Sequence, residues 1–143
     1  AEFLGGAGGI VMAGVVAAIA IPAYQDYTTR AKVSEGLMLS ESTKLAVTEH
    51  YVDTGEFPGQ GMAAELSEYT GDSQHVQSII VEPGTGRIVV NYSVESLPDG
   101  GQIYLRPYVD EVGDLQWDCS GTFPDKHLPA ACRGGEANGR TGA

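Results

Sequence analysis

The stretch that decides the fold is VAAIAIPAYQDYTTRAKVSEGL, residues Val16–Leu37. It joins an uncharged apolar run to a segment whose apolar residues recur with the period of a helix. Between Glu2 and Asp26 the chain carries no charged residue. As a helix, this run would reach roughly 34 Å, enough for a hydrocarbon core of about 30 Å. Residues 1–23 are therefore predicted to form an apolar membrane or self-association segment, and residues 24–143 a water-exposed domain.

Two residue types weaken helix formation within the apolar run. Glycines such as Gly14 each cost a helix about 1 kcal/mol relative to alanine. Pro22 lacks a backbone donor and disfavours helical geometry at the residue before it. A continuous, uniformly stable helix is therefore not expected here. A buried core helix is the alternative, although the rest of this small chain offers little apolar surface to enclose one.

From Tyr24 to about Asp53 the pattern is that of an amphipathic helix. A helical wheel separates its apolar residues into two faces. The broad face, expected to cover the rest of the domain, holds Tyr24, Tyr27, Ala31, Met38, Leu39, Leu45, Ala46 and Val52. The narrow stripe, expected to contact a neighbouring subunit, holds Val33, Leu37, Val47 and Tyr51.

The second half of the chain favours an antiparallel sheet. Residues 54–73 are rich in turn formers and predict a loop with a helical turn at Met62–Tyr69. Pro83-Gly84-Thr85-Gly86 predicts a hairpin between the first two of four strands. Pro107 within the third strand predicts an edge position or a strand end. The expected strands are His75–Glu82, Arg87–Val94, Gln102–Val109 and Leu115–Cys119.

Composition excludes several classes of function. Eight Lys and Arg against nineteen Asp and Glu give a formal charge of −11, which argues against a specific nucleic-acid binder. His50, His75 and His127 are far apart in the sequence, and no hydrolase or metalloprotease motif is present. The acidic turn Asp110–Asp118 offers oxygen ligands for Ca²⁺, but without the spacing of an EF-hand loop. We therefore predict no enzyme activity, no metal and no cofactor.

Cys119 and Cys132 are the two cysteines of the chain. In a reducing cytosol they would be free thiols, and their spacing fits no common zinc motif. In a domain tethered to a membrane and exported they would form a disulfide, which is the favoured interpretation.

The stretch Val16–Leu37 strongly resembles the helix of bacterial type IV pilins of the a class. Pro22, Tyr24 and Tyr27 match positions in mature pilins, and Gly14 matches the glycine that softens the family's helix. Trp117, Cys119, Pro129 and Cys132 are similar to the family's disulfide-bounded C-terminal region. The resemblance implies an α+β pilin fold, in which a long N-terminal helix packs on a four-stranded antiparallel sheet with a C-terminal region closed by the disulfide. The implied boundaries are the helix to about residue 53, an αβ-loop at about 54–74, the sheet at about 75–119, the D-region at 119–132 and a tail at 133–143.

The resemblance also implies a function. A pilin is held in the bacterial inner membrane and then polymerises with copies of itself into a surface filament, the pilus or fimbrium. The filament serves adhesion, twitching motility and phage attachment, so a host surface or a phage is the implied partner. Methylation in the family would fall on Ala1, and Gly5 stands where the family carries glutamate. The alternative is a pseudopilin of the type II secretion system, which shares the N-terminal helix.

Site residues follow from the same resemblance. Gly14 and Pro22 are expected to soften the helix in the filament. Packing in the filament core is expected from Ile10, Val11, Val15, Val16, Ile19, Ile21, Pro22, Tyr24 and Tyr27. Adhesive contacts are expected from exposed D-region residues, namely Ser120, Thr122, Asp125, Lys126 and His127.

Overall fold

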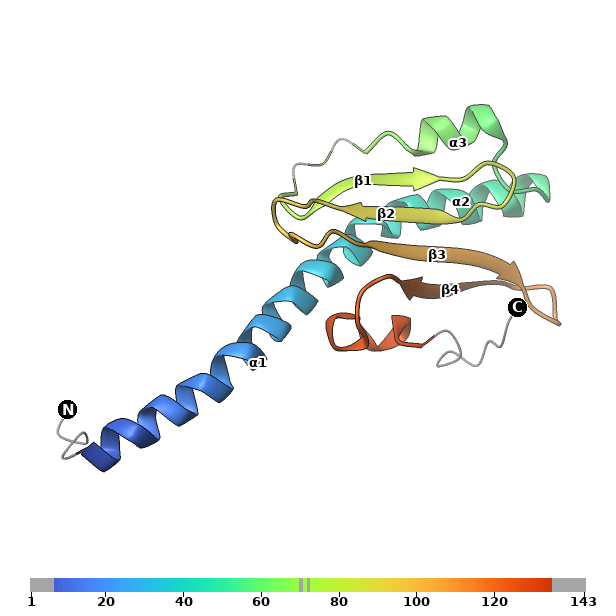
Figure 1. Ribbon diagram of the computed structural model, residues 1–143. Helices are drawn as coiled ribbons and strands as arrows, with labels where there is room; N and C mark the ends of the chain where they lie inside the picture. The colour runs from blue at the N-terminus through green and yellow to red at the C-terminus, as the bar shows by residue number, and fades with distance from the viewer. Residues whose placement is uncertain (1–6, 70, 72, 135–143) are drawn as a thin grey trace.

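A long helix leads into a domain built on a single sheet (Figure 1). The computed structural model describes residues 7–69, 71 and 73–134, with side chains from residue 23 onward. Helix α1 (Ala7–Leu39) is followed directly by α2 (Glu41–Thr54). At Ser40 between them the N–H donates to the carbonyl of Gly36 at 3.1 Å, and the carbonyl accepts from the N–H of Lys44 at 2.9 Å. The hydrogen-bond ladder therefore continues across the junction, which is a local irregularity in one long helix.

Helix α1 runs through both Gly14 and Pro22 without interruption. The prediction that the helix is not continuous in this stretch is therefore wrong. A proline removes one backbone donor, and the alanines between Gly14 and Pro22 are the strongest helix formers. The softening role of Gly14 and Pro22 within a filament stays a prediction.

The remaining elements form a short helix and an antiparallel sheet, as the sequence predicted. Helix α3 (Gln60–Leu66) begins two residues before the expected helical turn. The strands pair in sequence order as β1-β2-β3-β4, every neighbouring pair antiparallel. Their bounds are β1 (Val76–Val81), β2 (Ile88–Tyr92), β3 (Gln102–Val109) and β4 (Leu115–Gly121). The predicted α+β fold is confirmed.

Pro107 lies within β3, an inner strand of the sheet, so the prediction of an edge position or a strand end is wrong. The proline is tolerated there because β3 has no partner on its β2 side at this point. The β2–β3 pairing ends at Ile88 opposite Leu105, two residues before the proline. Pro107 itself pairs with Trp117 of β4 alone. The missing N–H of proline therefore costs no hydrogen bond to β2.

The core lies between the inner face of the sheet and one side of the long helix, and Figure 1 shows α2 running behind the sheet. Alternation along the strands sends apolar side chains to this inner face and polar ones to the outer face. The outer face carries Ser78, Asn91, Gln102 and Tyr104, which are paired across neighbouring strands. The buried inner side chains include Ile79, Val81, Ile88, Val90, Tyr92, Ile103 and Leu105, and the helix contributes Val33 and Val47.

The C-terminal region folds back beside β4 as two short 3₁₀ turns, η2 (Asp125–His127) and η3 (Ala130–Cys132). Cys119 at the end of the sheet is joined to Cys132 by a disulfide, as predicted. Closing a loop of this size stabilises a fold by about 3 kcal/mol in the chain-entropy model. No helix among the described residues combines the length and the apolar character needed to cross a membrane.

Tyr92 makes the closest approach between sheet and helix. Its hydroxyl donates a 2.5 Å hydrogen bond to the carbonyl of Val33, and its ring lies against Gly36. A Cβ at Gly36 would stand 2.0 Å from the tyrosine oxygen. Burial raises the pKa of the Tyr92 phenol well above its usual range, with a further contribution from the Glu35 carboxylate. The phenol is therefore protonated at neutral pH and can donate this hydrogen bond.

We expect Gly36→Ala to lower the free energy of unfolding by about 2–3 kcal/mol, because the added methyl group overlaps the Tyr92 side chain. Urea unfolding of the purified chain measures the loss. Gly61→Ala is the matched control, since it also lies in a helix but nothing lies within 4 Å of the added Cβ. The control should be neutral or stabilising by up to about 1 kcal/mol. Equal stability of the two variants would contradict the close contact.

Candidate functional site

The long helix presents one apolar stripe to the sheet and another to solvent, and their assignment is the reverse of the sequence prediction. Val33 and Val47, from the stripe assigned to a neighbouring subunit, are 0% exposed in the core. Leu37 packs beside them, and Tyr51 stacks on Phe57 with ring centroids 4.7 Å apart. The narrow stripe therefore covers the domain, and the predicted roles of the two faces are wrong.

Most of the broad face points away from the sheet. Its larger members, except for Leu39 at the core, are between 59% and 73% exposed. Several recur at intervals of three, four and seven residues, which places them on a single line along the helix. We name this line the outward stripe, and its members are Tyr24, Tyr27, Ala31, Met38, Leu45 and Val52.

The sheet packs against the side of the long helix that carries small side chains. Val33, Gly36, Ser40 and Val47 are small residues three, four and seven positions apart, and all four are buried. Ser40 satisfies its own hydroxyl by donating to the carbonyl of Leu37 at 2.8 Å. The helical wheel did not identify this row of small residues as the buried face of the helix. A wheel ranks the faces by their apolar residues and takes no account of how closely a sheet must approach the helix.

The predicted filament-core positions divide at residue 23. Tyr24 and Tyr27 lie exposed on the outward stripe. The remaining side chains lie outside the part of the chain whose side chains are described, so their packing role stays a prediction. These are Ile10, Val11, Val15, Val16, Ile19, Ile21 and Pro22.

The D-region is fixed at two places, by the disulfide to β4 and by polar contacts to α1. Asp26 accepts a 3.0 Å hydrogen bond from Nε2 of His127 and lies 3.7 Å from Nζ of Lys126. Arg30 donates from Nε to the carbonyl of Lys126 at 3.0 Å. The hydrogen bond from His127, with the nearby cationic side chain of Lys126, holds the pKa of the Asp26 carboxyl below its usual range. The contacts attach η2 to the helix.

The residues predicted to make adhesive contacts are not equally accessible. Ser120, Thr122, Asp125 and Lys126 are exposed. The side chain of His127 is only 20% exposed because it turns inward to Asp26. Nothing in the sequence between these residues signals the pairing, since 101 positions separate them. Their adhesive role stays a prediction.

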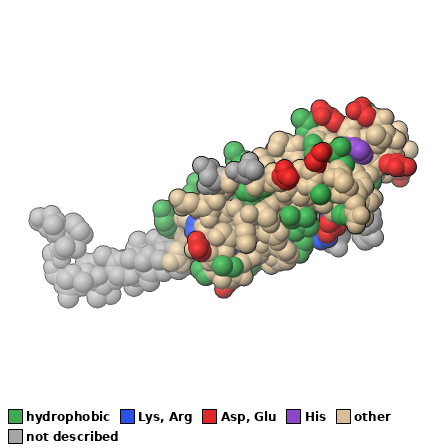
Figure 2. All heavy atoms as spheres, turned by 90° about the horizontal axis from the view of Figure 1, so that it is seen from above, with side chains coloured by type: hydrophobic (Ala, Val, Ile, Leu, Met, Phe, Trp, Pro, Cys, Tyr) green, Lys and Arg blue, Asp and Glu red, His purple; other side chains and the backbone are tan. Residues whose placement is uncertain are grey.

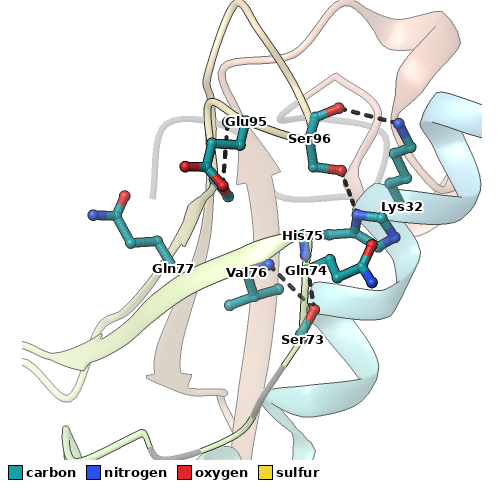
Figure 3. Close-up of a pocket in the computed structure, with 9 residues that line it drawn as sticks. Lys32, Ser73, Gln74, His75, Val76, Gln77, Glu95 and Ser96 are labelled. Atoms are coloured by element: carbon teal, nitrogen blue, oxygen red, sulfur yellow. Dashed lines mark hydrogen bonds between the residues drawn. The ribbon is translucent and has the colours of Figure 1, made fainter.

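A groove of about 670 Å³ lies where α1, the start of β1 and the loop after β2 meet (Figure 3). Lys32 donates from Nζ to the carbonyl of Ser96 at 3.0 Å, and Nδ1 of His75 is hydrogen-bonded to the Ser96 hydroxyl. Ser73 donates to the Glu35 carboxylate. These contacts tie two loops to one face of α1.

The order Ser96, His75 and Glu35 has the connectivity of a nucleophilic triad, but the geometry does not support that chemistry. Nε2 of His75 and Oε1 of Glu35 are 4.0 Å apart, which is beyond hydrogen-bond distance. The carboxylate instead accepts the hydroxyl of Ser73. The cluster therefore acts as a fastening between α1 and the loops.

The acidic turn uses its carboxylates internally. Asp110 accepts the N–H groups of Val112 and Asp114 at 3.0 and 2.8 Å, and the Asp114 contact is the main cause of its lowered pKa. Asp118 is paired with Arg106 at 2.5 Å. Within the described residues, no group of three or more His, Cys, Asp or Glu side chains is placed to hold a metal ion.

Acidic side chains outnumber basic ones on the face of the molecule that Figure 2 shows. In Figure 2 they gather over the end of the molecule away from the N-terminal part of α1, where few basic side chains are seen. This distribution agrees with the formal charge of −11. It places negative charge on the surface of the domain.

Val47→Asp and Leu45→Asp test the assignment of the two helix faces. We expect Val47→Asp to lower the free energy of unfolding by about 3 kcal/mol or more, because it buries an unpaired charge in the core. Leu45→Asp, two residues away on the exposed side, should change it by no more than about 0.5 kcal/mol. Urea unfolding followed by circular dichroism measures both. The opposite ranking would restore the original assignment.

The Asp26 contact predicts a pH dependence of stability. A carboxyl whose pKa is lower in the folded state contributes stability above its unfolded pKa, near 3.8, and loses it as the pH falls below that value. The difference in unfolding free energy between the wild-type chain and Asp26→Asn should therefore shrink between pH 6 and pH 3. Asp125→Asn, which removes an exposed carboxylate on η2, is the control for the loss of one negative charge. A gap as large at pH 3 as at pH 6 would rule out Asp26 as the titrating group.

Comparison with known proteins agrees with this geometry. The family of pilins, which are bacterial filament proteins, matches residues 29–133. Fimbrial protein EcpC of Eikenella corrodens is 33% identical over 129 residues, covering 87% of this chain and 83% of its own length. Type IV major pilin protein PilE1 of Neisseria gonorrhoeae is 33% identical over 145 residues, covering 87% of this chain and 81% of its own. Type IV major fimbrial protein FimA of Dichelobacter nodosus is 27% identical over 144 residues, covering 87% and 88%. With its long helix, four-stranded sheet and C-terminal disulfide, the chain belongs to the pilin family.

Proposed function

We propose that this chain, a structural subunit of a type IV pilus, polymerises through the outward stripe of α1 and α2. The single observation that carries the proposal is the exposure of large apolar side chains along one line of the helix, including Tyr27, Met38 and Val52. Exposed apolar area costs roughly 25 cal/mol per Å², so a row of such side chains favours a covering partner.

The spacing of the outward stripe indicates what covers it. Ala31, Met38, Leu45 and Val52 recur every seven residues, the repeat with which helices pack side by side. The chain itself supplies a matching element in its apolar segment, residues 10–23. Copies of this segment from neighbouring subunits would lie against the stripe, and the acidic domain would remain at the outside of the filament.

The membrane is the proposed location of the subunit before assembly. Its apolar N-terminal segment would be buried in the inner membrane and then transferred to the filament core, exchanging lipid contacts for contacts with other copies. Adhesion, twitching motility and phage attachment are the proposed activities of the assembled pilus. The exposed D-region residues Ser120, Thr122, Asp125 and Lys126 are the proposed contact points.

No specific observation favours the pseudopilin alternative. The relatives named above are pilins and fimbrial proteins. Asp110 of the acidic turn accepts three hydrogen bonds from within the turn and the following strand. The pilin family is a family of structural subunits, and the proposed function is accordingly assembly.

Met38→Asp tests the role of the outward stripe. Met38 is 73% exposed, so folding should be unaffected, while a charge in a packed helix interface should abolish filament formation. Electron microscopy of sheared surface material measures the filament yield. Met62→Asp, an exposed methionine on α3, is the control and should leave the yield unchanged. Normal filaments from Met38→Asp would contradict assembly through this stripe.

A further inference from the structure

A continuous row of polar side chains crosses the outer face of the sheet. Asn91 of β2 stands between Ser78 of β1 and Gln102 of β3 in the strand register. Nδ2 of Asn91 donates to the Ser78 hydroxyl at 3.0 Å, and Nε2 of Gln102 donates to Oδ1 of Asn91 at 2.6 Å. We name these three residues the amide ladder.

The amide ladder is held in place from one end. The hydroxyl of Tyr104 donates to Oε1 of Gln102. The guanidinium of Arg87 lies 4.3 Å from the centre of the Tyr104 ring and pairs with Glu82 at 2.7 Å. Each side chain therefore restricts the next, and a ligand would find polar groups already ordered, which lowers the entropic cost of binding.

Beside the ladder lies a hollow of about 520 Å³. The loop after β2 lines the hollow with Asp99, Gly100 and Gly101, and Thr122 also lines it. Gly100 and Gly101 have no side chains, so at these two positions the wall is formed by backbone. The hollow therefore stays open beside the three ladder residues.

The hydrogen-bonding capacity of the ladder is only half used. A side-chain amide has two N–H donors and an oxygen with two lone pairs. Within the described part of the chain, Asn91 and Gln102 each use one N–H and accept one hydrogen bond in the ladder. Each amide keeps one donor and one lone pair, a set that matches two adjacent hydroxyl groups, one accepting and one donating.

The charge of the residues around the hollow limits the class of ligand that it can bind. Asp99 is the only charged side chain among the described residues that line the hollow, and no cation lines it. With a formal charge of −11 on the chain, an anionic ligand would be repelled. A neutral ligand rich in hydroxyl groups fits both the amides and the carboxylate, which accepts hydroxyl donors strongly.

The position of the hollow suits an encounter with the surroundings of a filament. The outward stripe and the outer face of the sheet lie on opposite sides of the domain, with the helix and the core between them. This inference rests on the proposed assembly through the outward stripe. In such a filament the stripe faces the filament axis, and the outer face of the sheet points away from it. We propose that the amide ladder and the hollow beside it bind a neutral saccharide.

Titration of the full chain with oligosaccharides tests the proposal. The ¹⁵N-labelled chain is kept in dodecylphosphocholine micelles, which contain no sugar, and receives lactose, maltotriose or chitotriose. We expect at least one of them to shift the side-chain amide resonances of Asn91 and Gln102 saturably. The charged comparison, 3′-sialyllactose, should bind more weakly than lactose. No shift with any of the three neutral sugars, or tighter binding of sialyllactose, would overturn the proposal.

Variants locate the binding. Gln102→Ala should weaken it about tenfold, because the amide's hydrogen bonds to the sugar are lost. Gln116→Ala, an exposed amide on the same outer face but on β4 away from the hollow, is the matched control and should have no effect. Equal losses in the two variants would overturn the site. If Gln102→Ala does not fold, Asp99→Asn on the exposed loop replaces it, with an expected weakening of about fivefold.

Electron microscopy of the same variants separates the two proposals. Filaments with no response to sugar would contradict the saccharide site alone. A sugar response in a chain that forms no filaments would contradict assembly alone. Filaments formed by Gln102→Ala, together with weakened sugar binding, would support both.

Discussion

The contact between Tyr92 and Gly36 is the constraint on which the rest of the structure depends. A sheet reaches a helix closely only where the helix has no side chain in the way, and Gly36 is that position. The hydrogen bond from Tyr92 to the carbonyl of Val33 then fixes the rotation of the helix relative to β2. Because that rotation is fixed, one row of residues becomes core and the opposite row faces outward. Both the outward stripe and the orientation of the outer sheet face follow from this one contact.

Other residues of the same helix make polar contacts on both sides of the Tyr92 contact. Lys32 reaches the loop after β2 and Glu35 reaches the loop before β1, while Asp26 and Arg30 reach η2 nearer the N-terminus of α1. They are charged side chains on either flank of the small residues that face the sheet. Their heads bind backbone carbonyls, hydroxyls and the His127 ring, so the charged residues of α1 hold loops that have few apolar residues of their own.

Local signals in the sequence predicted the fold well, and nonlocal ones were missed. Pro83-Gly84-Thr85-Gly86 marked the first hairpin and so the strands on both sides of it, because turn chemistry is a local property. The faces of the helix were reversed because apolar area was ranked above closeness of approach. The pairing of His127 with Asp26 could not be predicted, since it depends on where the disulfide places η2. The amide ladder was likewise hidden, because it requires the register of three strands.

The order of contacts along α1 has a mechanical consequence. From the N-terminal side, the helix meets η2 at Asp26 and Arg30, then the loop after β2 at Lys32, and then the sheet at Val33 and Gly36. A tensile load entering through α1 therefore reaches the C-terminal region before it reaches the sheet. The C-terminal region is covalently joined to β4 through the disulfide between Cys119 and Cys132. Force on this region is therefore transmitted to the sheet through a covalent bond, and the region is not pulled away from β4. The disulfide thus strengthens the junction between α1 and the sheet domain under tension.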